Sequence, residues 1–132
     1  MSIQTGVERI LFVDDEEILV EMGKKILERL GYQVIARMNS IEALADFQHQ
    51  PEAFDLVITD QTMPDMTGID LAQSILEIRP DIPIILCTGY SSMISKKMVK
   101  SLGIKVVAMK PLVKGDLAIM IRQLLDKENR NV

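Results

Sequence analysis

Short runs of apolar residues alternate along the chain with longer segments in which apolar residues recur every three or four positions. Most of the short runs are almost continuously apolar, which is typical of parallel strands covered by helices on both faces of a sheet. The segment 33–38 is the most polar of the set, so we expect it to form an edge strand. The five runs predict strands at 10–13, 33–36, 56–59, 82–87 and 106–109.

The longer segments predict five helices, one after each strand. The first helix is expected from Glu17 to Leu30, where Gly31 supplies a stop signal. The second is expected to begin with Ser40 as its N-cap residue. Apolar residues at helical spacing mark the first two helices: Ile18, Met22, Ile26, Leu27 and Leu30, then Ala43, Leu44 and Phe47. The other three helices are marked by apolar residues within 69–78, 93–102 and 117–125.

This alternation predicts an α/β fold, a single (βα)₅ domain with a doubly wound parallel sheet. Right-handed crossovers favour the flavodoxin-like strand order 2-1-3-4-5, in which a ligand crevice opens at the carboxyl ends of strands 1 and 3. We expect the domain to span residues 8–127. Residues 1–7 are expected to be disordered or artificial, and residues 128–132 to form a polar tail after which no output domain follows.

Composition narrows the functional classes. The 132 residues suit one domain, and 48% hydrophobic residues suffice for a core without disulfides. A net charge of −4, 4% aromatic residues and no Trp argue against nucleic-acid binding. One Cys and one His exclude an internal disulfide and zinc sites that need two imidazoles. With no apolar run long enough to span a membrane and no secretion signal, we expect a cytoplasmic domain without a membrane partner.

Acidic residues follow the first and third predicted strands. Asp14 and Asp15 come directly after residues 10–13, and Asp60 comes after residues 56–59. Neighbouring strands lie about 4.8 Å apart, so these carboxylates should converge at one edge of the sheet. A hard divalent cation would offset their repulsion, and Mg²⁺ suits an incomplete cage of oxygen ligands. The segment 15–17 by itself is equally explained as acidic residues at a helix N-terminus.

Two further polar residues end predicted strands at the same edge. Thr88 follows the fourth strand, and Lys110 follows the fifth and precedes Pro111. Lys110 could be a surface lysine with a buried stem, but Pro111, through a cis peptide bond, would aim it inward. A metal cage, a carboxylate nucleophile, a hydroxyl and a cation together are the requirements for an aspartyl-phosphate intermediate. The chain has neither a G-x-x-x-x-G-K-[ST] loop nor a G-x-G-x-x-G motif, so no nucleotide-binding motif competes with this interpretation.

Over about residues 8–127 the chain resembles the receiver domains of two-component response regulators. The resemblance is carried by four motifs in the family's order and spacing: Asp14-Asp15, Asp60-x-x-Met63-Pro64-x-x-x-Gly68, Thr88-Gly89 and Lys110-Pro111. It implies that Asp60 accepts a phosphoryl group from a histidine kinase or a phosphotransfer domain. The implied readout is a partner-binding face formed by the fourth helix, the fifth strand and the fifth helix.

The resemblance also implies a metal-binding role for the acidic residues. Asp15 would ligate Mg²⁺ directly, with Mn²⁺ as a substitute, and Asp14 would do so mainly through water. Asp60 and the backbone carbonyl of Thr62 would complete the protein ligands.

The remaining motif residues would serve the phosphoryl group itself. Lys110 would pair with its oxygens, Thr88 would move to hydrogen-bond one of them, and Gly89 would leave backbone room beside it. The chain departs from the family at Val107, where receiver domains usually carry Tyr or Phe. This departure leaves the coupling of Thr88 to the output face open. Thr62 and Tyr90 occupy the two positions that flank the path of the attacking water in receiver domains, so the resemblance implies that Tyr90 shields the acyl phosphate.

Two other functions are alternatives to a receiver. An aspartate-nucleophile phosphohydrolase normally needs a general-acid Asp two residues past the nucleophile, and Thr62 stands there. A pseudo-receiver that serves only as an interaction module would not need the complete set of motif residues. We therefore expect no classical enzyme, but a domain that promotes its own aspartyl phosphorylation and dephosphorylation. It could be a stand-alone regulator or the receiver of a hybrid histidine kinase.

Overall fold

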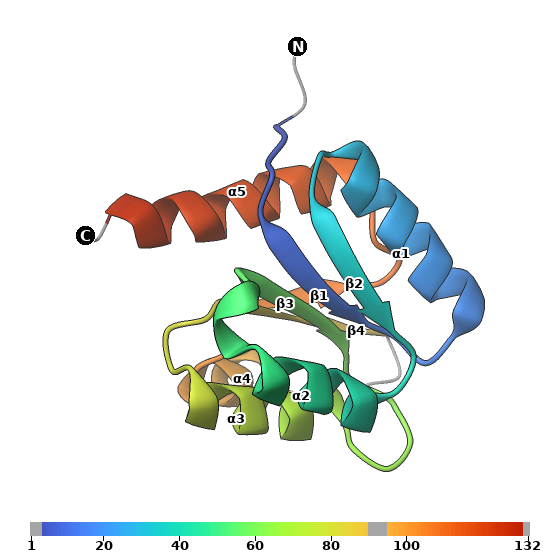
Figure 1. The fold of residues 1–132 in the computed structure, drawn as a ribbon, viewed down its shortest axis with the longest axis vertical. Helices are drawn as coiled ribbons and strands as arrows, with labels where there is room; N and C mark the ends of the chain where they lie inside the picture. The colour runs from blue at the N-terminus through green and yellow to red at the C-terminus, as the bar shows by residue number, and fades with distance from the viewer. Residues whose placement is uncertain (1–3, 90–94, 131–132) are drawn as a thin grey trace.

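The computed structural model describes residues 4–89 and 95–130. Five parallel strands form one sheet in the order β2-β1-β3-β4-β5, as the sequence pattern predicts (Figure 1). The edge position of β2 agrees with its more polar sequence. The strands are β1 Arg9–Val13, β2 Gln33–Arg37, β3 Leu56–Asp60, β4 Ile84–Thr88 and β5 Val106–Met109.

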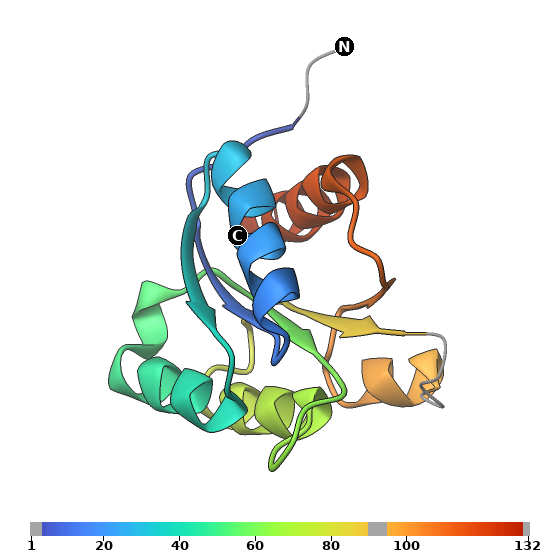
Figure 2. The same cartoon turned by 90° about the vertical axis from the view of Figure 1, so that its right-hand side faces the viewer.

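Five α-helices cover the sheet in two layers. Helices α1 and α5 lie on one face, and α2, α3 and α4 lie on the other, as Figures 1 and 2 show from two sides. A short 3₁₀ helix, η1, follows α2. The helices are α1 Glu17–Arg29, α2 Ser40–His49, η1 Pro51–Ala53, α3 Gly68–Ile78, α4 Lys96–Ser101 and α5 Lys114–Arg130. The predicted start of the fourth helix at residue 93 lies outside the described residues.

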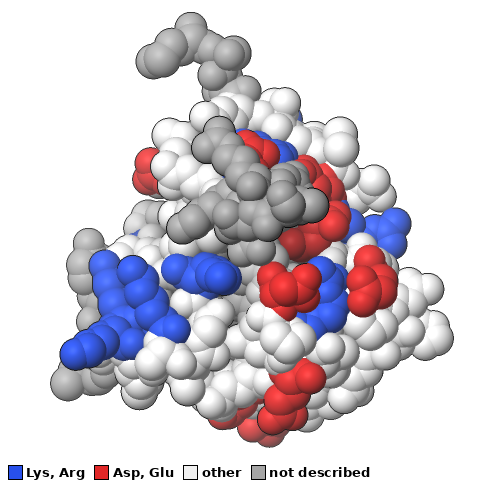
Figure 3. Space-filling view, turned by 90° about the vertical axis from the view of Figure 1, so that its left-hand side faces the viewer, with Lys and Arg blue, Asp and Glu red and all other residues white. Residues whose placement is uncertain are grey.

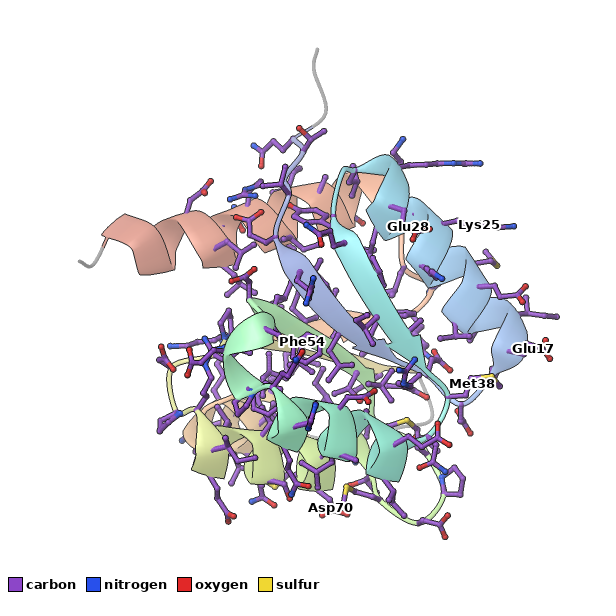
Figure 4. All side chains as sticks on the ribbon, in the orientation of Figure 1. Glu17, Lys25, Glu28, Met38, Phe54 and Asp70 are labelled. Carbon is purple, nitrogen blue, oxygen red and sulfur yellow. The ribbon has the colours of Figure 1, made fainter. Side chains whose placement is uncertain are left out.

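The strands are continuously apolar because successive residues pack into two separate cores. Ile10 and Phe12 of β1 belong to the core under α1 and α5, whereas Leu11 and Val13 belong to the core under α2, α3 and α4. Every residue of β3 and β4 is buried. In the second core the rings of Phe47 and Phe54 stack with their centroids 5.9 Å apart, and Phe54 is labelled in Figure 4.

Strand β4 begins two residues later than the predicted segment 82–87 and ends at Thr88. The reason lies at Pro83, which has no amide hydrogen for the strand ladder and offers only its carbonyl, to the amide of Val57 (3.1 Å). At the other end of the strand, Thr88 pairs with Met109 of β5 and is the last residue of β4, which places its side chain at the carboxyl edge of the sheet.

The predicted N-cap of the second helix is wrong by one residue. Asn39, and not Ser40, caps α2, because its side-chain oxygen accepts hydrogen bonds from the amides of Ile41 (2.8 Å) and Glu42 (3.2 Å). The Ser40 hydroxyl is buried and donates to the carbonyl oxygen of Met66 at 2.8 Å. Ser40 thus fixes the loop that follows β3, a role its sequence position does not reveal.

Helix α1 buries a different stripe from the apolar residues that mark it in the sequence. Its buried residues are Val20, Gly23 and Leu27, whereas Ile18 is 72% exposed and Met22 is 53% exposed. Gly23 allows this packing because a Cβ at its position would collide with the ring of Phe12 on β1. In Figure 4, Lys25 projects from α1 away from the sheet, and both Lys25 and Glu28 are exposed.

All five strands point the same way, so their carboxyl ends lie at one edge, beside the N-terminal end of α1 (Figure 1). In Figure 3 a basic patch lies at the lower left of the view, while acidic and basic side chains alternate toward the centre and right, so neither sign of charge dominates that side. Within residues 4–89 and 95–130, no helix combines the length and apolar character needed to cross a bilayer.

Candidate functional site

The first residue of the site, Asp14, directly follows β1 and is only 4% exposed. Its backbone amide donates to the carbonyl of Arg37 (3.1 Å), which extends the β1–β2 pairing by one residue. One carboxylate oxygen, Oδ1, accepts a hydrogen bond from the amide of Glu16 at 3.0 Å. The other, Oδ2, accepts one from Lys110 Nζ at 3.0 Å. The Asp14 carboxylate is therefore held in place from two sides.

Lys110 joins the ends of three strands. Its backbone amide donates to the carbonyl of Thr88 (2.9 Å), and its Nζ lies 3.0 Å from Asp14 Oδ2 and 3.1 Å from Asp60 Oδ1. The peptide bond from Lys110 to Pro111 is cis. Lys110 is thus not a surface lysine reaching for solvent, because its ammonium group bridges two buried carboxylates.

Asp60 ends β3 and is 7% exposed. Burial raises the pKa of its carboxyl above the ordinary value of 3.8, and the negative charges of Asp14 and Asp15 act in the same direction. The hydrogen bond and charge of Lys110 oppose this rise without cancelling it. Burial acts to lower the pKa of Lys110, but its hydrogen bonds to Asp14 and Asp60 outweigh burial and raise that pKa, so the lysine is a cation at neutral pH.

Asp14, Asp15 and Asp60 form a group able to hold a metal ion, with one oxygen of each lying within 4.8 Å of the others. The alternative interpretation of segment 15–17, as acidic residues at a helix N-terminus, applies to Glu16 and Glu17, whereas Asp15 belongs to the acidic group. Glu16 occupies the N-cap position of α1 and makes no side-chain capping hydrogen bond, while Glu17 lies in the first turn. Three carboxylates this close repel one another unless cations offset their charge, and oxygen ligands of this kind suit a hard divalent cation.

The loop after Asp60 is anchored by Gln61 and Gly68. The amide of Gly68 donates to the Gln61 carbonyl (3.0 Å), and the Gln61 side chain accepts from the amide of Ile69 at 2.8 Å. A Cβ at Gly68 would collide with the carbonyl oxygen of Asp60, so only glycine allows α3 to start this close to the site. Gln61 is not among the site residues that the sequence predicts, although its position directly after Asp60 is a signal for it.

Thr62 and Met63 lie in the same loop and differ in exposure. Met63 is 7% exposed, and its sulfur accepts a hydrogen bond from the Ser40 hydroxyl at 3.5 Å. Thr62 is exposed, two residues beyond Asp60. Buried Met63 thus holds the loop against α2, while Thr62 remains at the mouth of the site.

Thr88 lies at the end of β4 with 5% of its surface exposed. Its hydroxyl donates a hydrogen bond to the sulfur of Met109 at 3.5 Å. A Cβ at Gly89 would meet no atom within 4 Å, so open space lies beside that backbone. Val107 is partly buried against the core under α2, α3 and α4. Tyr90 lies outside the described residues.

A largely apolar cavity of about 400 Å³ opens beside the acidic group. Asp14, Gly89 and Lys110 form its polar end, where it meets the site. Its apolar walls come from β1, from α1 and from the segment after β5: Phe12, Leu19, Met22, Ile26, Pro111 and Leu112. Helical spacing brings Leu19 and Met22 together on α1, but the cavity could not be predicted from the sequence because Leu112 reaches them only in the folded chain.

Comparisons with known proteins agree with this geometry. The family model described as response regulator receiver domain matches residues 10–122. The response regulator receiver protein CpdR of Brucella abortus is 37% identical over 86 residues, 65% of this chain and 70% of CpdR. The aerobic respiration control sensor protein ArcB of Escherichia coli is 31% identical over 122 residues, 91% of this chain but only 15% of ArcB. A solved receiver domain from Clostridium thermocellum superposes with a TM-score of 0.90 at 28% identity, covering 96% of this chain and all of that one.

Proposed function

The chain belongs to the response regulator receiver family and is a phosphoacceptor signalling domain, and on that premise we propose that Asp60 is the acceptor. A histidine kinase or a phosphotransfer domain would supply the phosphoryl group from a phosphohistidine. The bond between phosphorus and the histidine nitrogen breaks, that nitrogen leaves with the electron pair, and a new bond forms between phosphorus and an oxygen of Asp60.

One observation carries this proposal: the ammonium group of Lys110 lies 3.0 Å from Asp14 and 3.1 Å from Asp60. A fixed cation at this place offsets the charge that develops on a transferred phosphoryl group. Because burial raises the pKa of Asp60, Lys110 also helps to keep that carboxyl ionised and able to attack. Lys110 therefore serves both the nucleophile and the phosphoryl oxygens.

Asp14, Asp15 and Asp60 are the side chains that would hold a divalent cation, with the backbone carbonyl of Thr62 as a further ligand. Mg²⁺ fits this oxygen donor set, and Mn²⁺ would substitute for it. When bound, the cation supplies charge neutralisation for the phosphoryl oxygens. The Asp14 carboxylate, which is held by the Glu16 amide and by Lys110, would offer its oxygens to the cation from the end of β1.

After transfer, Thr88 would hydrogen-bond a phosphoryl oxygen, and the open space beside Gly89 would admit the group. Tyr90 would shield the acyl phosphate from attacking water and lengthen its lifetime. The signal would leave through the face formed by α4, β5 and α5, to an output protein or domain. Val107 differs from the aromatic residue that receiver domains usually carry there, so the aromatic half of the usual coupling is absent from this chain.

A catalytic phosphohydrolase is less well supported, because exposed Thr62 has no carboxyl to protonate a leaving group. A pseudo-receiver would not require the convergence of Asp14, Asp60 and Lys110. The match to CpdR spans most of that protein and the match to ArcB a small part, so a stand-alone regulator and a receiver of a hybrid kinase both have precedent among the relatives. In either setting we expect the domain to act in the cytoplasm.

The direct experiment incubates the protein with acetyl phosphate and Mg²⁺ and follows its intact mass. The wild type and the control variant Asp81→Asn, which changes an exposed carboxylate outside the site, should each gain the mass of one HPO₃ group. Asp60→Asn should gain none, and EDTA should suppress the reaction of the wild type. Equal phosphorylation of Asp60→Asn and wild type would refute the proposal.

A further inference from the structure

The last strand offers a link from the site to the molecular surface. The side chain of Val107 has no polar atom and packs against the core under α2, α3 and α4. Two residues further on, Met109 ends β5 with 43% of its surface exposed. Met109 is therefore placed to contact the site on one side and solvent on the other.

Thr88 and Met109 are direct partners across the sheet. They are paired in the parallel register of β4 and β5, and the amide of Lys110 donates to the Thr88 carbonyl (2.9 Å), which fixes the two strand ends together. Within the described part of the chain, the Thr88 hydroxyl makes one hydrogen bond, to the Met109 sulfur at 3.5 Å. Met109 thus holds the orientation of the Thr88 hydroxyl in this structure.

This hydrogen bond is of the kind that a phosphoryl group would displace. A thioether sulfur is a weak acceptor, whereas an anionic oxygen forms charge-assisted hydrogen bonds about twice as strong as neutral ones. The Thr88 hydroxyl would exchange the sulfur for the phosphoryl oxygen. Met109 is unbranched, with three rotatable bonds, so it would then adopt other rotamers at little cost.

Met109 also forms part of a groove between β5 and α5, with a volume of about 470 Å³. Val113 and Ile119, which are 52% and 49% exposed, line the same groove. A rotation of the Met109 side chain therefore changes the apolar wall of the groove between β5 and α5. Helix α5 lies beside α1 on one face of the sheet (Figure 2).

We propose that Met109 couples phosphorylation of Asp60 to the β5–α5 groove. In the resting state its sulfur holds the Thr88 hydroxyl, and on phosphorylation it is released and rearranges the groove wall. This assigns a coupling role to Met109 in a chain that has Val107 in place of the family's usual aromatic residue. The inference rests on the proposed function, since it requires a phosphoryl group at Asp60.

The test follows the methionine ε-methyl resonances by NMR in isotope-labelled protein, before and after addition of acetyl phosphate and Mg²⁺. The spectrum of Met109→Leu assigns the Met109 resonance. That resonance should shift on phosphorylation by more than the resonance of Met98, a similarly exposed methionine (46%) on α4. In Thr88→Val, which lacks the hydroxyl, phosphorylation should leave the Met109 resonance unmoved, and Thr88→Ser should restore the response.

The intact mass of each sample separates failure of the coupling from failure of the proposed function. If no HPO₃ is gained, the assignment of Asp60 fails before the coupling is tested. If the mass rises and the Met109 resonance stays in place, the coupling is wrong while the phosphoacceptor role stands. The coupling would also be wrong if the Met109 resonance of phosphorylated Thr88→Val shifted as much as that of the wild type, because the signal would then reach Met109 without Thr88.

Discussion

Replacing Lys110 with Met tests whether this lysine balances the acidic group. Met keeps the unbranched stem and removes the charge, so packing around the stem changes little. The matched control is Lys25→Met, because the Lys25 side chain projects from α1 into solvent (Figure 4). The quantity measured is the free energy of unfolding in EDTA, so that no divalent cation can replace the lysine.

The expected size follows from the distances in the site. With an effective dielectric constant of about 20, the contacts of Lys110 at 3.0 and 3.1 Å each contribute about 5 kcal/mol of gross attraction. The oxygens of Asp14, Asp15 and Asp60 lie within 4.8 Å, so each ionised pair repels by at least about 3 kcal/mol. Attraction and repulsion nearly balance, and without Lys110 the repulsion stands alone.

The net loss is smaller than these gross energies, because solvation and protonation relieve part of the repulsion. Removing one partner of a buried ion pair typically costs 3–5 kcal/mol, and we take about 3 because the Lys110 side chain is 21% exposed. For 132 residues, at about 2.1 cal/mol/K per residue, this loss lowers Tm by about 11 °C.

The pH dependence gives the prediction a second readout. Lys110 lowers the pKa of Asp60, so without the lysine that pKa rises further above 3.8. The destabilisation of Lys110→Met should therefore be largest at neutral pH and shrink as pH falls and Asp60 becomes protonated. Thermal and urea denaturation, followed by circular dichroism at several pH values, would measure both the loss of stability and its dependence on pH. A Tm for Lys110→Met equal to that of Lys25→Met at neutral pH would refute the reasoning.

Three further predictions concern Asp60, Gly68 and the metal ion. In EDTA, Asp60→Asn should be more stable than the wild type at neutral pH. The reason is that the pKa of Asp60 is raised by folding, so the stability of the wild type falls as pH rises above 3.8, whereas the asparagine of the variant does not titrate. An advantage in Tm of the variant that grows toward acid pH would contradict this. Gly68→Ala should lower Tm and slow phosphorylation, because its Cβ would meet the Asp60 carbonyl, whereas Gly115→Ala, which meets no atom within 4 Å, should do neither. Mg²⁺ at about 100 times its Kd should stabilise the wild type by about 2.7 kcal/mol, as measured by thermal melts, and stabilise Asp15→Asn clearly less; equal stabilisation would exclude Asp15 as a ligand.

The order of strands and helices could be predicted because it depends on local periodicity and on the handedness of crossovers. The packing of individual side chains could not be predicted in this way. Ile18 and Met22 have helical spacing, yet Val20 and Gly23 face the core, because the ring of Phe12 occupies the space that a larger residue than Gly23 would need. Similarly, Asn39 and Ser40 are both good capping residues, and the choice depends on the distant carbonyl of Met66.

The convergence of Asp14, Asp60 and Lys110 could be predicted from the sequence, because parallel strands bring their carboxyl ends to one edge. The hydrogen bond from Thr88 to Met109 could not, because it depends on the register of β4 against β5, which is set by packing rather than by a motif.

The most direct measurement of the central claim locates the phosphoryl group. After reaction with acetyl phosphate and Mg²⁺, borohydride reduces an aspartyl phosphate to homoserine, and tandem mass spectrometry identifies the changed residue. Homoserine should be found at position 60, on the peptide that contains the end of β3. Homoserine at another aspartate, or an acid-stable phosphate on a hydroxyl residue, would contradict the assignment of Asp60 as the phosphoacceptor.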